Sequence, residues 1–183
     1  MKKLIIIICL TFFIPVAHAG WNPKKKKNVV TKEQKQKVEE TIAAFKEKDP
    51  EIDVFFEEAR GYSVFPSIGK GGIGIGGAHG KGVVYDRGKL IGTSKMTQLS
   101  IGLQLGAQSY SEIIFFKDKK ALEDFTGGKF KFGAHVSAVA LEAGASATAA
   151  YNDGVAIFTM IRGGLMYEAS VGGQKFSYAP LHK

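Results

Sequence analysis

Apolar residues near the start of the chain recur at the spacing of one helical face. Val38, Ile42 and Phe45 are four and then three residues apart, which places them on a single stripe. The segment Thr31–Gln34 reads Thr-Lys-Glu-Gln, the pattern of a capping box. We therefore expect an amphipathic helix over residues 31–48, with lysines outside its apolar stripe.

Two shorter helices are expected further along the chain. Asp49-Pro50 resembles a helix start, because proline is favoured at the first helical position. Residues 52–59 then supply an apolar face. Asp118 to Phe125 predicts a short internal helix that ends at Gly127-Gly128.

Beyond Gly61 the period of the pattern changes from helical to two. Residues 99–108 alternate large apolar with small or polar side chains, which is a strong strand signature. Residues 129–150 are rich in Ala, Gly and Ser and are interpreted as two strands of small side-chain volume. Further apolar strands are expected at residues 112–116, 155–161 and 165–171. Short turns between strands predict an α+β fold, with a strongly curved or barrel-like antiparallel β-sheet and the helices to one side.

One strand candidate is unusually rich in glycine. Gly72, Gly74 and Gly76 fall on one face of a strand, and Ile73 and Ile75 fall on the other. A strand with a bare face indicates a tight bend or the close approach of another group. A curved sheet packed closely against helices is favoured here over a surface that a ligand approaches.

The same glycines also satisfy a loose nucleotide-binding pattern, Gly72-x-Gly74-x-x-Gly77. A dinucleotide-binding turn requires a helix directly after the glycines. Residues 80–85 are instead of β type, and Gly82 stands where a phosphate-binding loop needs Ser or Thr. The sequence therefore argues against nucleotide binding.

The first residues have the organisation of an export signal. Lys2 and Lys3 precede an apolar run, Leu4–Ile14, and Ala17–Ala19 forms an A-x-A cleavage site. We expect cleavage near Ala19-Gly20 and a location in the bacterial periplasm or outside the cell. The expected organisation is a signal peptide (1–19), a mobile basic arm (20–30) and one domain (31–180).

Positive charge is concentrated after the expected cleavage site. Residues 20–48 contain nine lysines and four glutamates, whereas the rest of the chain is nearly balanced. Basic clusters are attracted to anionic membranes by about 1 kcal/mol per lysine, and an amphipathic helix can bury its apolar face there. From the residues alone, a solvated arm with a helix packed on the sheet is equally compatible. Nucleic acid is disfavoured, because export and the lack of interleaved aromatic residues argue against it.

Catalytic signatures are weak. The histidines after the leader, His79, His135 and His182, are isolated, so no metal site is expected. The single cysteine, Cys9, lies within the leader, and no G-x-S-x-G motif occurs. We expect a protein without enzymatic activity, catalytic residues, metal or cofactor.

Several of these segments together resemble the SYLF domain family. The resemblance covers about residues 32–177 and is most specific at Ser100–Ser111, which reads SIGLQLGAQSYS. It is also carried by residues 59–66, 70–77, 80–85, 113–116, 120–125 and 164–173.

The resemblance implies a lipid-binding domain. Eukaryotic members bind phosphoinositides, an N-terminal basic amphipathic helix is implicated, and some fungal members bind actin. By position, that helix corresponds to Thr31–Lys48, with Lys32, Lys35 and Lys37 as candidate headgroup contacts. This chain lacks the SH3 or FYVE domain of eukaryotic members, and its export signal argues against actin as a partner.

The sequence thus predicts an exported domain that associates peripherally with anionic membrane phospholipid. The candidate lipid-binding residues are Lys24, Lys25, Lys26, Lys27, Lys32, Lys35, Lys37, Lys70 and Lys81. Two alternatives stay open: a small outer-membrane β-barrel, and a protein-binding envelope module without lipid affinity.

Overall fold

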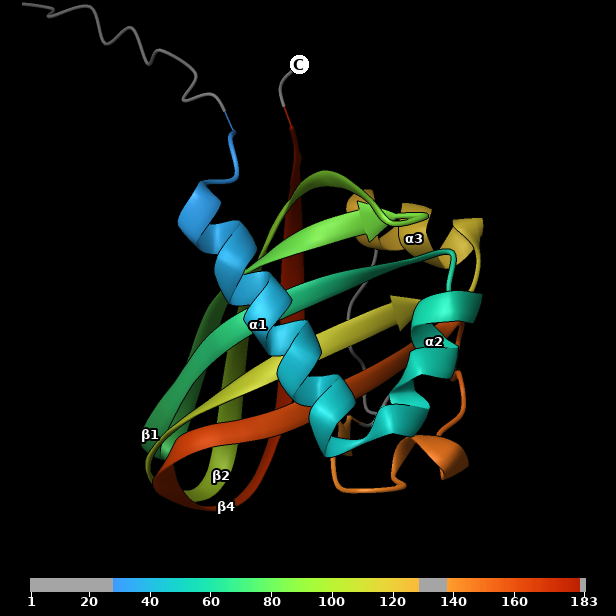
Figure 1. The fold of residues 1–183 in the computed structure, drawn as a ribbon. Coiled ribbons are helices and arrows are strands. Elements are labelled where there is room, and N and C mark those ends of the chain that lie inside the picture. Colours follow the sequence, from blue (N-terminus) through green and yellow to red (C-terminus); the bar gives the residue numbers. More distant parts are fainter. Residues whose placement is uncertain (1–27, 129–137, 182–183) are drawn as a thin grey trace, which may run out of the picture.

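The computed structural model describes residues 28–128 and 138–181, which form an α+β fold around one sheet (Figure 1). The elements in chain order are α1 (Lys32–Lys48), η1 (Pro50–Ile52), α2 (Asp53–Glu58), β1 (Gly61–Asp86), β2 (Lys89–Phe116), α3 (Lys119–Thr126), β3 (Val139–Ala140), η2 (Ser146–Thr148) and β4 (Val155–Pro180). The sheet order is β1-β2-β4-β3; β2 pairs antiparallel with β1 and β4, whereas β3 pairs parallel with β4. The predicted fold class is confirmed, with a sheet that is strongly curved but open.

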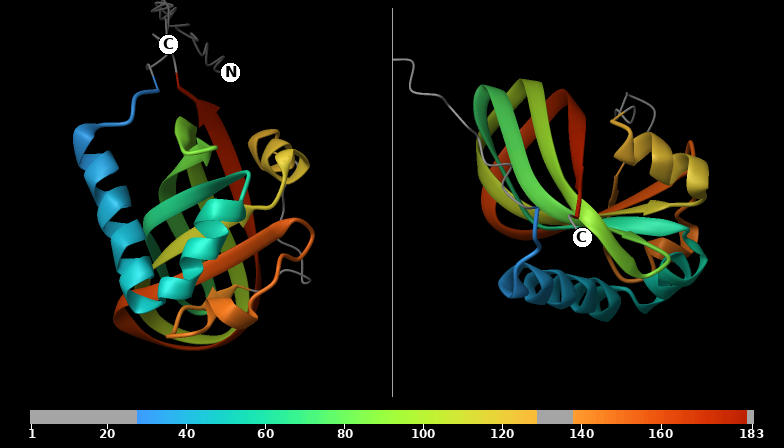
Figure 2. Two further views of the ribbon diagram at one scale, coloured as in Figure 1. Left: turned by 45° about the vertical axis from the view of Figure 1, so that its right-hand side comes forward. Right: turned by 90° about the horizontal axis from the view of Figure 1, so that it is seen from above.

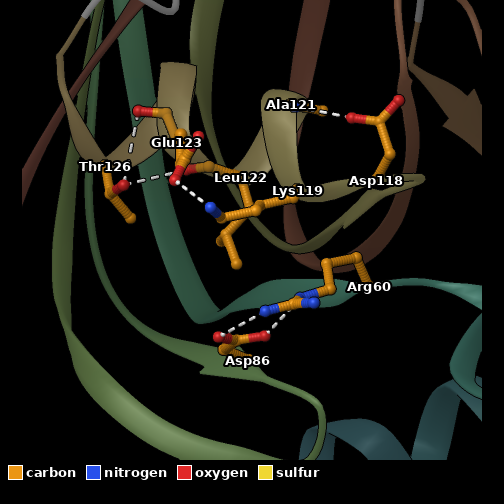
Figure 3. A network of polar contacts seen from close by, with 8 residues as sticks. All are labelled: Arg60, Asp86, Asp118, Lys119, Ala121, Leu122, Glu123 and Thr126. Atoms are coloured by element: carbon orange, nitrogen blue, oxygen red, sulfur yellow. Dashed lines mark hydrogen bonds and ion pairs between the residues drawn. The ribbon is translucent and has the colours of Figure 1, made fainter.

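The three long strands double back on themselves. A straight strand of 26 residues would extend roughly 85 Å, yet the two ends of β1 meet. The guanidinium of Arg60 donates to both carboxylate oxygens of Asp86, at 2.7 and 3.2 Å (Figure 3). The rings of Tyr62 and Tyr85 stack with centroids 4.8 Å apart. The strands therefore bend midway, where Figure 1 carries the labels of β1, β2 and β4.

Glycine makes this bend possible in β1. The backbone turns so tightly that a Cβ atom on Gly72 would overlap the Cα atom of Gly76, and Gly74 has a φ of +70°. Opposite Gly74, β2 takes a longer path, because Ile73 pairs with Leu105 but Ile75 pairs with Ile101. The predicted bend is confirmed.

The expected helix packing against these glycines is wrong. Gly72 faces the backbone of its own strand, and Gly76 faces the side chain of Gln104. The Gln104 amide donates to the carbonyl oxygens of Gly74 and Ser100, each at 3.1 Å. A buried side-chain amide therefore fills the inside of the bend.

Alternate residues of the strands enter two hydrophobic cores on opposite faces. Phe65 and Phe116 enter the core inside the doubled sheet, and Val64 and Phe115 enter the core under α1 and α2. From α3, Phe125 reaches the inner core, where its ring lies 4.8 Å from that of Phe116. Figure 2 shows α1 along one side of the sheet and α3 at another.

The helices follow the sequence signals closely. The Thr31 capping box begins α1, and Asp118 accepts from the backbone of Ala121 at the start of α3 (Figure 3). Asp49 begins η1 and also accepts from the backbone N–H and hydroxyl of Ser146, at 2.8 and 2.6 Å. Within the described residues, no helix has both the length and the apolar character needed to cross a bilayer.

The expected pair of strands over residues 129–150 is wrong where it can be judged. Residues 129–137 lie outside the described part of the chain. From residue 138 to 150, the chain forms the two-residue strand β3 and the short helix η2. Small side chains supply little cross-strand packing, so this segment follows the loop geometry that Asp49 imposes through Ser146.

Candidate membrane-binding surface

The apolar stripe of α1 packs on the sheet. Val38 and Phe45 are buried in the outer core, together with strand residues. Of the two arrangements that the sequence left open, the structure has the packed one. Lys32 and Lys35 remain exposed on α1, away from this stripe.

A groove of about 290 Å³ lies between α1 and the second half of β1. Lys37 borders it from the helix, and His79 and Lys81 border it from the strand. The Lys37 ammonium lies 2.7 Å from the carboxylate of Glu33, and this hydrogen bond raises the pKa of Lys37. The structure thus brings together two of the predicted lysines, Lys37 and Lys81, although they are distant in sequence.

Lys81 belongs to a cationic band across the outer face of the sheet. It lies directly opposite Lys95 in the β1–β2 register, and both side chains are exposed. Lys175 pairs with Thr97 and is therefore diagonal to Lys95. Like charges directly opposite in a ladder destabilise a sheet. Among the described residues, no ion pair with a carboxylate offsets this repulsion at Lys81, Lys95 or Lys175.

Next to this band, the outside of the bend is apolar. Six side chains of β1 and β2, here named the apolar cap, have between 61 and 80% of their surface exposed. They are Ile73, Ile75, Leu99, Ile101, Leu103 and Leu105. Leu165 of β4, opposite Ala107, extends the surface and is 92% exposed.

The apolar cap inverts the usual distribution of side chains. Ser100 and Gln104, which alternate with its leucines, are buried inside the bend. Contiguous exposed apolar surface of this kind is typical of sites that bind a protein or a membrane. Polar residues lie inside the bend and apolar residues outside it.

The other predicted lysines are distributed differently. Lys70 lies in the first half of β1, beside a second hollow lined by Lys48, Gln108 and Glu142. Lys24, Lys25, Lys26 and Lys27 lie outside the described residues.

Sequence reasoning missed Lys95, Lys175 and the exposure of the apolar cap. The position of Lys95 could have been predicted from the alternation of side chains along a strand. Lys95, Leu99 and Leu103 are even numbers of residues apart, so they lie on the same face of β2.

One buried carboxyl group lies between the two halves of the sheet. Glu112 of β2 accepts a hydrogen bond from Gln174 of β4 at 3.2 Å, and its Oε1 atom has no partner among the described residues. Burial raises the pKa of Glu112 to about 7, although the hydrogen bond from Gln174 opposes the shift. No cluster of three potential His, Cys, Asp or Glu metal ligands occurs in the part of the chain that the structure describes.

Together these features define an α+β domain whose doubled sheet presents a cationic band beside an apolar tip. Residues 97–179 match the family model Ysc84, described as "Las17-binding protein actin regulator". The Ysc84 model represents the SYLF domain, so these residues belong to the SYLF family, a family of lipid-binding domains.

The comparison with curated proteins extends the similarity beyond that segment. The chain is 31% identical over 136 residues to Beta cell expansion factor A of Aeromonas veronii. This alignment covers 74% of the chain and 51% of the relative, so the chain spans about half the length of that protein.

Proposed function

We propose that this protein associates peripherally with anionic phospholipid membranes, as an exported domain without enzymatic activity. The observation that carries the proposal is the pairing of Lys81 with Lys95, with Lys175 on their diagonal. Phosphate groups of lipid would neutralise a repulsion that the described residues leave unbalanced.

The predicted basic arm fits the same function. Lys24–Lys27 would add positive charge to the chain, and anionic surfaces attract basic clusters. Lys32 and Lys35 extend the exposed charge of α1, and Lys37 adds a cation at the groove beside Lys81. The helix therefore contributes charge, while its apolar stripe stays on the sheet.

Other partners fit less well. The matched family is described by binding to Las17 and actin regulation, but the export signal predicted at residues 1–19 would separate the chain from cytoplasmic actin. Nucleic acid is not proposed for the same reason. A protein-binding module of the cell envelope is the alternative that a lack of vesicle binding would favour.

Sedimentation with vesicles tests the proposal. The full chain is mixed with phosphatidylcholine vesicles containing graded phosphatidylglycerol, at low and at high salt. Lys81→Gln, Lys95→Gln and Lys175→Gln are combined, and about 1 kcal/mol per lysine predicts about a hundredfold weaker binding at low salt.

The matched control combines Lys89→Gln, Lys119→Gln and Lys120→Gln, which changes net charge equally. Lys119 and Lys120 already pair with Glu123 and Asp124, so this variant should bind nearly as the parent does. Equal losses in the two variants, or no dependence on phosphatidylglycerol, would contradict the proposed site.

A further inference from the structure

The apolar cap lies beside the cationic band on the same outer face of β2. Along this strand, Lys95 is followed by Leu99 and then by Leu103 at the bend. Four residues of strand extend about 13 Å, so the first leucine of the cap lies about that far from the lysine. The charged and apolar surfaces thus follow one another toward the tip of the molecule.

We propose that the apolar cap inserts into the acyl region of the bilayer while Lys81, Lys95 and Lys175 contact the headgroups. This inference rests on the proposed function and adds a depth and an orientation to it. The inserting element is the bend of the sheet. It is not the first helix, whose apolar stripe is buried in the outer core together with Val64 and Phe115.

Charge complementarity favours a membrane as the occupant. Residues 61–85 and 89–111 contain no Asp or Glu, so β1 and β2 around the cap carry only cations. The lysines have flexible stems, which let an ammonium remain at the phosphate level while nearby residues lie deeper. Two strands that are apolar at the tip and carry lysines without carboxylates behind it match an anionic bilayer.

The backbone of the β2 part of the cap is also compatible with an apolar medium. Within the cap, Leu99, Ile101 and Leu105 of β2 pair with β1 on one side and with β4 on the other. The ladder hydrogen bonds of this central strand are therefore made within the sheet, and insertion leaves few of its polar groups unsatisfied.

A protein partner or a second copy fits the cap less well. The cap consists of Ile and Leu, whereas Trp, Tyr and Arg dominate the binding energy of protein interfaces. The surface also lies on the outside of a bend, and two convex surfaces bury little area against each other. A fluid bilayer, in contrast, adapts to a convex tip.

A fluorescent probe placed within the cap tests the insertion directly. Leu103→Cys in a Cys9→Ser background is labelled with the environment-sensitive dye NBD and mixed with vesicles of equal phosphatidylglycerol and phosphatidylcholine. We expect a blue shift, a severalfold rise in emission, and quenching by lipids that carry a nitroxide on the acyl chain. The control is Arg87→Cys, at the exposed turn after β1, which should show none of these changes.

Two outcomes separate this inference from the function on which it rests. If the labelled chain sediments with anionic vesicles but the probe at residue 103 stays in water, insertion is wrong and peripheral binding stands. If the chain does not sediment with anionic vesicles at all, the proposed function itself fails.

A matched pair of variants tests the same surface without labels. Ile101→Ser with Leu103→Ser should reduce binding that resists high salt at least tenfold. Val29→Ser with Val54→Ser, at two exposed sites outside the cap, should not. Circular dichroism checks that all variants fold alike.

The second-copy alternative makes a different prediction. The parent would elute as a dimer and the Ile101→Ser, Leu103→Ser variant as a monomer, with vesicle binding unchanged. That result would assign the cap to self-association and overturn insertion.

Discussion

Gln104 occupies the space into which a Cβ atom on Gly76 would project. Its Nε2 atom donates to the carbonyl oxygen of Gly74, and its Oε1 atom accepts from the hydroxyl of Ser100 at 2.9 Å. One side chain of β2 therefore holds the bend of β1 from the inside. We expect the fold of the tip to depend on this contact.

Gly76→Ala should destabilise the protein by about 1–3 kcal/mol, the usual range for overpacking a buried site. The new methyl group would force Gln104 from its place and leave polar groups unsatisfied. Denaturant unfolding measures the change. The control is Gly69→Ala in the same strand, where nothing lies within 4 Å of the added Cβ atom. Equal losses at the two positions would contradict the role of Gln104.

Lys95→Glu should separate stability from binding. It replaces a repulsive cross-strand pair with an attractive one, so the free energy of unfolding should rise by about 0.2–1 kcal/mol. Vesicle binding should fall at the same time, because the cationic band loses its centre. A variant that loses both stability and binding would indicate that Lys95 has a structural role instead.

Because Glu112 is buried, the free energy of unfolding should depend on pH. Its pKa is raised by burial from 4.5 to about 7, so between these values the folded protein holds a proton that the unfolded chain releases. Stability should therefore fall as pH rises through this window, by about 3 kcal/mol in total. Unfolding measured from pH 4.5 to 8 checks the slope.

The matched variants for this prediction are Glu112→Gln and Glu40→Gln. The first substitutes a neutral amide for the buried carboxyl group and should flatten the profile, with its largest stabilisation at pH 8. The second lies on the exposed face of α1 and should leave the slope intact. Parallel profiles for the parent and Glu112→Gln would show that another group causes the dependence.

The ion pair of Arg60 and Asp86 is expected to fasten the two ends of β1. Both side chains are partly exposed, at 22% and 30%, so solvent screening limits the coupling energy. A double-mutant cycle with Arg60→Gln and Asp86→Asn should give about 1 kcal/mol, at the upper end for exposed pairs. A coupling near zero would assign the closure of β1 to its other contacts, the Tyr62–Tyr85 stack and the backbone hydrogen bond from Arg87 to Arg60.

The helices were predictable because their signals are local. The Thr31 capping box and the Asp118 cap each act within four residues, so sequence spacing alone locates them. The β character of residues 99–108 was also predictable, because alternation is a property of neighbouring positions.

The orientation of that strand was not predictable in the same way. Alternation separates Leu103 from Gln104, but it does not say which of the two faces the interior. The bend decides, because the close approach of Gly72 to Gly76 leaves an interior space that Gln104 fills. The contact between Gln104 and Gly74 joins residues 30 positions apart in the sequence.

In the candidate site too, single residues could be predicted from the local sequence, but contacts between strands could not. Lys81 was predicted from its place in a glycine-rich motif. Its pairing with Lys95 and its nearness to Lys175 depend on the register of three strands. Lys24–Lys27, predicted from composition, lie outside the described residues and remain a prediction.

Asn28 joins the two described ends of the chain. Its side chain donates to the carbonyl oxygens of Ala179 and Pro180, at 2.7 and 3.0 Å. Both described ends of the chain therefore meet at one pole, opposite the bend (Figure 1). A tag or fusion partner joined next to residues 28 or 181 would therefore lie far from the tip and would leave the apolar cap accessible to a bilayer.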